Sequence, residues 1–151
     1  MQVFNIASTT GRPFWILLPA FLVTAVAIGV LVMVTLAART ARFEVSSDGM
    51  RLRGDLWGRF IPAAALRVDQ ARRIDFTTSP ELLPGRRTMG TGLPGYQSGW
   101  FRLKNGDKAL LYLTDRSKAI YIPTREDYAL LLSPDDPDRF MAALRNVAGR
   151  P

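Results

Sequence analysis

Hydrophobic residues follow two different patterns along this chain, and the patterns change near residue 40. The stretch from Pro13 to Ala38 (PFWILLPAFLVTAVAIGVLVMVTLAA) contains no charged side chain. From Arg42 onward, short runs of alternating apolar and polar residues are separated by Gly, Pro, Asn and Asp. A continuous apolar run predicts a buried or membrane-spanning helix, whereas alternation predicts half-buried strands. We therefore expect an N-terminal tail (1–12), a transmembrane helix (13–38) and a β-rich domain (39–151).

The apolar run is long enough for a single membrane crossing. About 20 apolar residues in a helix span a hydrocarbon core of about 30 Å. A cleavable signal peptide is the alternative, but its apolar region covers only about 7–15 residues. One arginine, Arg12, precedes the run, whereas Arg39, Arg42, Arg51 and Arg53 follow it. Because positive residues favour the cytoplasmic side, we expect the C-terminal domain in the cytoplasm.

The region after residue 42 predicts a mainly β domain. Asp48-Gly49 separates RFEVSS from MRLRG, and Asn105-Gly106 separates two longer runs, so both dipeptides predict hairpins. Trp57-Gly58 turns the chain into RFIP, and KAIYIPT and DYALLLS follow later as two further strands. A longer strand is expected in ALRVDQARRIDF, with inward residues Leu66, Val68, Ile74 and Phe76. About eight short strands at this spacing are typical of an antiparallel sandwich or barrel.

The last segment predicts one amphipathic helix. Asp136 precedes Pro137, and this order suits an N-cap followed by the first helical position. Four apolar residues recur at helical spacing: Phe140, Met141, Leu144 and Val147. We expect this helix to close one end of the barrel.

Composition argues against most enzyme classes. The chain has no cysteine and no histidine, which removes thiolate nucleophiles, Ser-His-Asp triads and the usual zinc sites. The carboxylate pairs Glu126-Asp127 and Asp135-Asp136 are better explained as a turn and a helix cap. We predict no enzyme activity, cofactor or metal. The net charge of +7 suits a membrane protein with arginine flanks or an anionic lipid surface. The dispersed arginines lack the motifs of a nucleic-acid reader.

The stretch MGTGLPG contains a literal G-x-G-x-x-G at Gly90, Gly92 and Gly95. A dinucleotide site requires a helix that begins within these glycines, but Pro94 and the strand-like GYQSGWFRL follow instead. A nucleotide site is therefore excluded, and we expect a loop of roughly 20 residues. That loop is either a structural crossover or a binding rim in which Tyr96 is exposed. The candidate residues for binding a partner or lipid are Arg86, Arg87, Thr88, Gly90, Thr91, Gly92, Gly95 and Tyr96.

Several stretches together resemble the bacterial pleckstrin-homology (PH) domain family of small membrane-anchored proteins. The stretches are RRTMGTGLPGYQSGWFRL, NGDKALLYLTDRSKAIYIPT and YALLLSPDDPDRFMAALR, and the resemblance runs from about Phe43 to Arg145. Its most specific parts are Arg87 to Gly95 and Ser133 to Pro137. The resemblance implies a PH-like barrel of two antiparallel sheets capped by a C-terminal α-helix, in a single-pass protein of the bacterial cytoplasmic membrane. It implies no catalytic residue.

Two functions fit these expectations. The first is a non-enzymatic docking or scaffold module that binds a protein partner through a sheet edge or the glycine-rich segment. The second is an anionic-lipid reader in which Arg86 and Arg87 join Arg72, Arg73 or Arg102 in one basic patch. The other aromatic residues are expected to pack in the core or at its rim: Trp57, Trp100, Phe101, Tyr112, Tyr121 and Tyr128.

Overall fold

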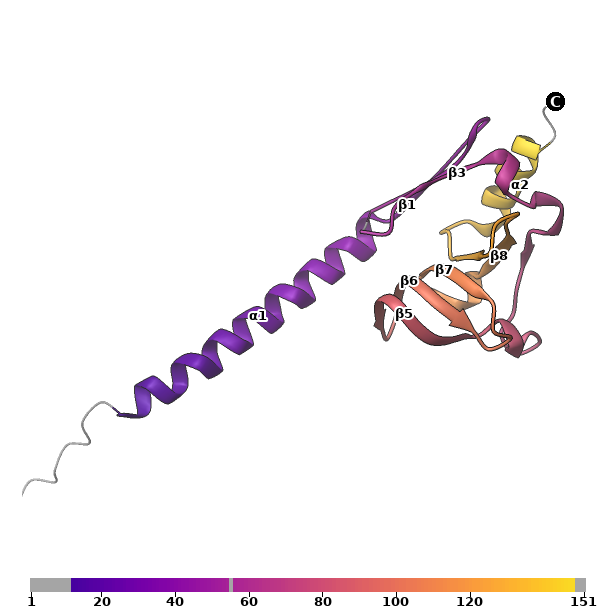
Figure 1. The fold of residues 1–151 in the computed structure, drawn as a ribbon. Coiled ribbons are helices and arrows are strands. Elements are labelled where there is room, and N and C mark those ends of the chain that lie inside the picture. Colours follow the sequence, from indigo (N-terminus) through magenta and orange to yellow (C-terminus); the bar gives the residue numbers. More distant parts are fainter. Residues whose placement is uncertain (1–11, 55, 149–151) are drawn as a thin grey trace, which may run out of the picture. The chain divides into compact units, whose positions relative to one another are not determined.

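The computed structural model describes residues 12–54 and 56–148 (Figure 1). The chain divides into two compact units, Met1–Leu36 and Ala37–Pro151. Apart from Arg12, the predicted tail (1–12) lies outside the described residues.

The helix predicted in the apolar run is present as α1 (Arg12–Thr40), which contains Pro19. Its described apolar side chains are exposed, and Trp15 and Phe21 are each 77% accessible. The hydroxyl groups of Thr24 and Thr35 donate to carbonyls four residues earlier, each at 2.8 Å. Among the residues described with their side chains, no helix has both the length and the apolar character that a membrane crossing requires. The predicted crossing is therefore not confirmed.

The second unit begins with a three-stranded sheet in the order β1-β2-β3. Its strands are β1 (Arg42–Ser46), β2 (Gly49–Arg53) and β3 (Phe60–Pro62). The β1–β2 hairpin is confirmed, although its turn lies one residue earlier than expected because Ser46 pairs with Gly49. Gly49 has a φ of 150°, and a Cβ there would strike the Ile61 carbonyl of β3.

A six-stranded sheet follows, in the order β4-β8-β9-β7-β6-β5. Its strands are β4 (Arg72–Arg73), β5 (Pro84–Leu93), β6 (Tyr96–Leu103), β7 (Lys108–Leu113), β8 (Ile120–Pro123) and β9 (Ala129–Leu132). The expected hairpin around Asn105-Gly106 is β6–β7, and RFIP, KAIYIPT and DYALLLS contain β3, β8 and β9. The prediction of two wholly antiparallel sheets is wrong at one pair, since β7 and β9 are parallel. After β7 the chain skips one position to form β8, and β9 then fills the gap.

The long strand predicted across residues 65–76 is also wrong. This segment contains the 3-10 turns η1 (Ala63–Ala65) and η2 (Val68–Gln70) and only the two-residue strand β4. The N–H groups of Leu66 and Ala71 close these turns by bonding to carbonyls three residues earlier, at 3.1 and 3.2 Å. The inward residues were nevertheless predicted correctly: Leu66, Val68 and Ile74 are buried and Phe76 is half-buried. The alternation reflects burial in this segment and not an extended backbone.

The six-stranded sheet has an apolar core on each face. Leu110, Leu130 and their neighbours face the three-stranded sheet, whereas Leu111 and Leu131 face residues of the β4–β5 connection such as Leu82. The C-terminal helix α2 (Pro137–Ala148) covers the first core with Phe140, Met141 and Leu144. The Arg139 N–H donates to the Asp136 carboxylate at 3.0 Å, which confirms the predicted cap. Two sheets and a C-terminal helix are what a PH-like fold requires.

Candidate functional site

The glycine-rich segment forms a hairpin, so the prediction of a loop without secondary structure is wrong. Strands β5 and β6 pair from Pro84 and Leu103 to Leu93 and Tyr96, which leaves a two-residue turn at Pro94-Gly95. Gly90 faces Gly99 across the pair, and a Cβ on Gly99 would lie 2.5 Å from the Met89 carbonyl oxygen. The two facing glycines therefore allow β5 and β6 to approach each other closely. In the sequence, the same glycines made the segment resemble a loop.

Tyr96 was predicted to be exposed, and this prediction is wrong because only 6% of the residue is accessible. It is the first residue of β6 and pairs with Leu93 across the turn. The hairpin places Tyr96 beside the end of β7, where the side chain borders two cavities. Tyr96 therefore lines these cavities as a buried residue and is not part of a solvent-exposed rim.

The other candidate residues lie along β5, which is an edge strand of the six-stranded sheet. Arg86, Arg87 and Thr88 are exposed, and the Thr88 hydroxyl donates to the Trp100 carbonyl at 2.9 Å. Gly90 and Thr91 are half-buried, whereas Gly92 and Gly95 are exposed.

The basic patch suggested by the sequence is divided by the sheet order. Arg72 and Arg73 lie on β4, the opposite edge from β5, and four strands separate these edges. Arg73 forms an ion pair with Asp138 at 3.2 Å, and Arg102 donates to the Gly106 carbonyl at 3.0 Å. Arg86 and Arg87 remain on β5, with Arg102 on the neighbouring strand β6.

A cleft of about 820 Å³, here called the β1 cleft, is the largest of the described cavities. Strand β1 borders one side, the start of α2 borders another, and residues of β6 and β7 complete the lining. The lining residues are Ala41, Arg42, Phe43, Glu44, Val45, Tyr96, Tyr112, Thr114, Ser133, Pro134, Asp135, Asp136, Arg139, Phe140 and Ala143.

Strand β1 lines this cleft and is an edge strand of its sheet. The Leu52 N–H donates to Arg59 beyond β2, at 2.9 Å, so the main-chain groups of Leu52 point away from β1. Its β1 partner Phe43 therefore belongs to a non-hydrogen-bonded pair, and the same holds two residues on for Val45 and Met50. The N–H and C=O groups of Phe43 and Val45 consequently point away from β2. They lie at an edge strand that a further strand can join.

The polar groups of the β1 cleft have structural partners. The Ser133 hydroxyl accepts the Thr114 N–H at 2.8 Å and lies 3.3 Å from the Tyr112 carbonyl oxygen. The Glu44 carboxylate pairs with Arg53 at 3.2 Å. Among the described residues, no group of three or more acidic side chains is placed to hold a metal ion.

A cation–aromatic cluster that was not predicted from the sequence lies beside Trp100. The Arg59 guanidinium lies 4.9 Å from the centre of the Trp100 ring, and the Lys108 ammonium lies 4.6 Å from it. Tyr128 meets Trp100 edge to face at 5.1 Å, and burial raises the pKa of its hydroxyl above the usual 10.0. Arg59 comes from the β2–β3 connection, so no local pattern could have placed it beside β6. The cluster joins the two sheets.

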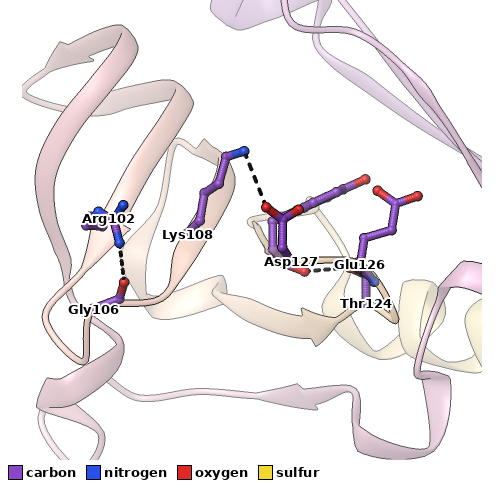
Figure 2. Close-up of polar contacts among 7 residues, drawn as sticks. Arg102, Gly106, Lys108, Thr124, Glu126 and Asp127 are labelled. Carbon is purple, nitrogen blue, oxygen red and sulfur yellow. Dashed lines mark hydrogen bonds and ion pairs between the residues drawn. The ribbon is translucent and has the colours of Figure 1, made fainter.

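Figure 2 shows the outer part of this region, where Lys108 points toward the β8–β9 connection. Its ammonium lies 4.0 Å from the Asp127 carboxylate, and the Glu126 N–H donates to Thr124 at 3.2 Å. The Glu126-Asp127 pair thus belongs to a turn, as predicted. An exposed pair of this kind contributes little to stability.

Comparison with known proteins gives one positive result. A family model described as "Bacterial PH domain" matches residues 44–148. No curated protein and no solved structure matches the chain. The matched range covers β1 from Glu44, both sheets and all of α2. Since this match spans more than half of the chain, the protein belongs to the bacterial PH domain family.

Proposed function

We propose that this protein is a non-enzymatic docking module whose PH domain binds an extended segment of a protein partner. The observation that carries the proposal is the β1 edge. The backbone groups of Phe43 and Val45 point away from β2, and both residues line the β1 cleft. A partner strand that joins an exposed edge gains main-chain hydrogen bonds, and neighbouring pockets select its side chains. Family membership supports a docking role, since PH domains are generally non-catalytic modules.

We further propose that α1 anchors this module in a bacterial cytoplasmic membrane, with the PH domain in the cytoplasm. The helix has 29 residues, and its stretch from Pro13 to Ala38 is uncharged. At 1.5 Å per residue, a helix of this length measures about 43 Å, which exceeds a hydrocarbon core of about 30 Å. The exposed apolar side chains of α1 favour an apolar environment. The arginines that follow the helix favour the cytoplasmic orientation.

The docking proposal is tested by photo-crosslinking in cells that express the full chain. A photo-crosslinking amino acid replaces Arg42, an exposed β1 residue that lines the cleft. In the same chain, Val45→Pro removes the outward N–H, and proline is tolerated on an edge strand whose N–H is not used in the sheet. We expect capture of a defined protein, loss of that capture in Val45→Pro, and retention in Val45→Ala, which keeps the N–H.

Two results would contradict docking at this edge. One is a capture pattern that Val45→Pro leaves unchanged. The other is equal capture when the photo-crosslinker replaces Thr78, an exposed residue of the β4–β5 connection. Far-ultraviolet circular dichroism of each variant checks that the domain stays folded.

Anionic lipid is the second candidate, and the exposed positions of Arg86 and Arg87 on one edge strand favour it. Each basic residue close to an anionic surface contributes about 1 kcal/mol. On this hypothesis the PH domain binds anionic vesicles but not neutral ones. High salt and the double change Arg86→Ala/Arg87→Ala should both abolish the binding, and indifference to lipid charge would exclude it.

A further inference from the structure

A second cavity, of about 450 Å³, lies at the turn of the β5–β6 hairpin. We call it the hairpin pocket. Its lining includes Gly92 and Gly95 of the hairpin, Leu113 at the end of β7, and Arg116. Tyr96 and Thr114 line both this pocket and the β1 cleft, so these two residues form a wall that the cavities share. An extended segment seated along β1 would have to pass around Tyr96 and Thr114 to enter the hairpin pocket.

The charge of this pocket is positive. Arg116 is the only residue with a formal charge among those that line it. The neighbouring Asp115 carboxylate is occupied locally, because it accepts from the Ser117 N–H at 2.9 Å and the Ser117 hydroxyl at 2.7 Å. Within the described part of the chain, the ion pairs of the second unit involve other basic residues: Arg53, Arg73 and Lys108.

A second cation, Arg87 of β5, lies beside Gly92, one of the residues that line the pocket. Nη1 of Arg87 lies 3.4 Å from the point where a Cβ on Gly92 would stand, and the Phe101 ring lies 3.7 Å from that point. Because Gly92 has no side chain, the guanidinium lies over the strand beside a residue that lines the pocket. Arg87 and Arg116 thus approach from different elements.

Gln97 supplies a third group. Its side-chain oxygen Oε1 is buried and is the one buried side-chain polar atom of the described residues without a hydrogen-bond partner. Gln97 pairs with Gly92 on one side and with Leu113 on the other, and all three residues line the pocket. A buried polar group without a partner is destabilising. Because protein atoms cover Oε1, a ligand donor reaches it only when the Gln97 side chain turns toward the pocket.

We propose that the hairpin pocket binds an acidic residue within an extended peptide segment of the partner. The carboxylate of that residue pairs with Arg116 and Arg87, while a backbone N–H of the same segment donates to Gln97. Arginine is suited to this role because its guanidinium forms charge-assisted, often bidentate, bonds with carboxylates. The inference rests on the proposed docking function and names the chemistry of the segment that docks.

The test measures binding of a fluorescein-labelled hexaglutamate peptide to the full chain, held in nanodiscs of neutral phosphatidylcholine. Fluorescence anisotropy gives the affinity at fixed salt. We expect Arg116→Gln and Arg87→Gln each to weaken binding by about tenfold, the loss typical of one charge-assisted bond. Arg125→Gln is the matched control, since Arg125 is exposed, carries the same charge and lines no described cavity.

Gln97→Leu gives an independent readout. It removes the unsatisfied acceptor, so we expect a higher melting temperature together with weaker peptide binding. If Gln97 had only a structural role, its replacement by leucine would not raise the melting temperature and weaken peptide binding at the same time. Unchanged affinity in Gln97→Leu would overturn the assignment of this residue.

Three other outcomes would overturn the proposal. They are absence of hexaglutamate binding, an equal loss in all three arginine variants, and binding of anionic vesicles with none of the peptide. Failure of the docking function is recognised separately, by capture at Arg42 that Val45→Pro does not alter. A chain that loses capture in Val45→Pro but keeps it in Arg116→Gln docks its partner without an acidic contact in this pocket.

Discussion

Leucine side chains have opposite surroundings in the two units of this protein. Leu22 of α1 is 65% accessible, whereas Leu110 of β7 is completely buried. The PH domain produces its own apolar environment, because two sheets and α2 enclose the core between them. In α1 the apolar side chains cover the helix without such enclosure. Similar apolar side chains are therefore enclosed by the fold in one unit and exposed in the other.

The largest effect is expected from charge in α1. Val23→Arg/Val26→Arg places two cations within the apolar run, and each costs about 2.5–3.5 kcal/mol at the centre of a membrane helix. We expect the full chain to leave the alkali-resistant membrane fraction, while circular dichroism shows an intact PH domain. Val23→Leu/Val26→Leu should remain in the membrane. Continued membrane retention of the arginine variant would refute anchoring by α1.

A large effect on stability is expected from the core of the PH domain. Leu110→Ala leaves a cavity between the sheets and should lower the free energy of unfolding by about 4 kcal/mol. The same truncation at Leu22 should leave the stability of the PH domain unchanged. Urea-dependent proteolysis of the membrane-bound chain measures both. Equal losses in the two variants would mean that the units share one core.

The facing glycines of the β5–β6 hairpin give the next effect. Gly99 has a φ of 111°, and an added Cβ would meet the backbone of Met89 and Gly90 at 2.5 and 2.6 Å. Gly99→Ala should therefore lower the free energy of unfolding by about 3 kcal/mol. Gly106→Ala is the control, because its φ of 92° is similar but no atom lies within 4 Å of the added Cβ. Only about 1 kcal/mol is expected there, and the difference isolates the cost of close strand contact.

A smaller effect is expected at the N-terminus of α2. Asp136→Ala removes the acceptor of the Arg139 N–H and should lower the free energy of unfolding by about 1 kcal/mol. Asp135→Ala should lower the free energy of unfolding by less. In the described hydrogen bond of Asp135, its backbone carbonyl accepts from Lys118 at 2.9 Å. Thermal unfolding of both variants at neutral pH makes the comparison. The opposite order would argue against the cap.

The smallest effect is expected in the stability of the fold at acidic pH. Hydrogen bonds from Ser117 lower the pKa of Asp115 below its usual 3.8. This carboxylate therefore stabilises the fold above pH 3.8, and the contribution is lost as the pH falls below that value. Asp115→Asn should flatten the fall of the melting temperature in this range, and Ser117→Ala should flatten it partly. An unchanged slope in Asp115→Asn would exclude the contribution.

Sequence analysis located most of the fold, because strong local signals determine its elements. Turn dipeptides identified both the β1–β2 and β6–β7 hairpins, and Asp136 with Pro137 identified the start of α2. Periodicity also identified inward residues correctly between Leu66 and Ile74, although their backbone forms turns. Local patterns report which side chains are apolar and where the chain turns, but they do not report the partner of each strand.

The candidate site was predicted only in part, for the same reason. Arg87, Gly92 and Tyr96 were identified as a group, yet their segment is a hairpin and Tyr96 is buried. The contribution of Gln97 and Arg116 was missed, since Arg116 reaches the hairpin pocket only when β6 pairs with β7. The exposed β1 edge depends on strand order and also could not be deduced.

Three features were predictable from the sequence alone: a helix with a long uncharged stretch, a mainly β domain and a capped C-terminal helix. These features follow from local periodicity, turn chemistry and residue composition, which act over a few neighbouring residues. Three other features depend on the paired strands: the parallel β7–β9 pair, the close contact of Gly90 with Gly99, and the two cavities that share Tyr96 and Thr114. Each of these depends on contacts between residues far apart in the chain, and their geometry exists only after the strands have paired.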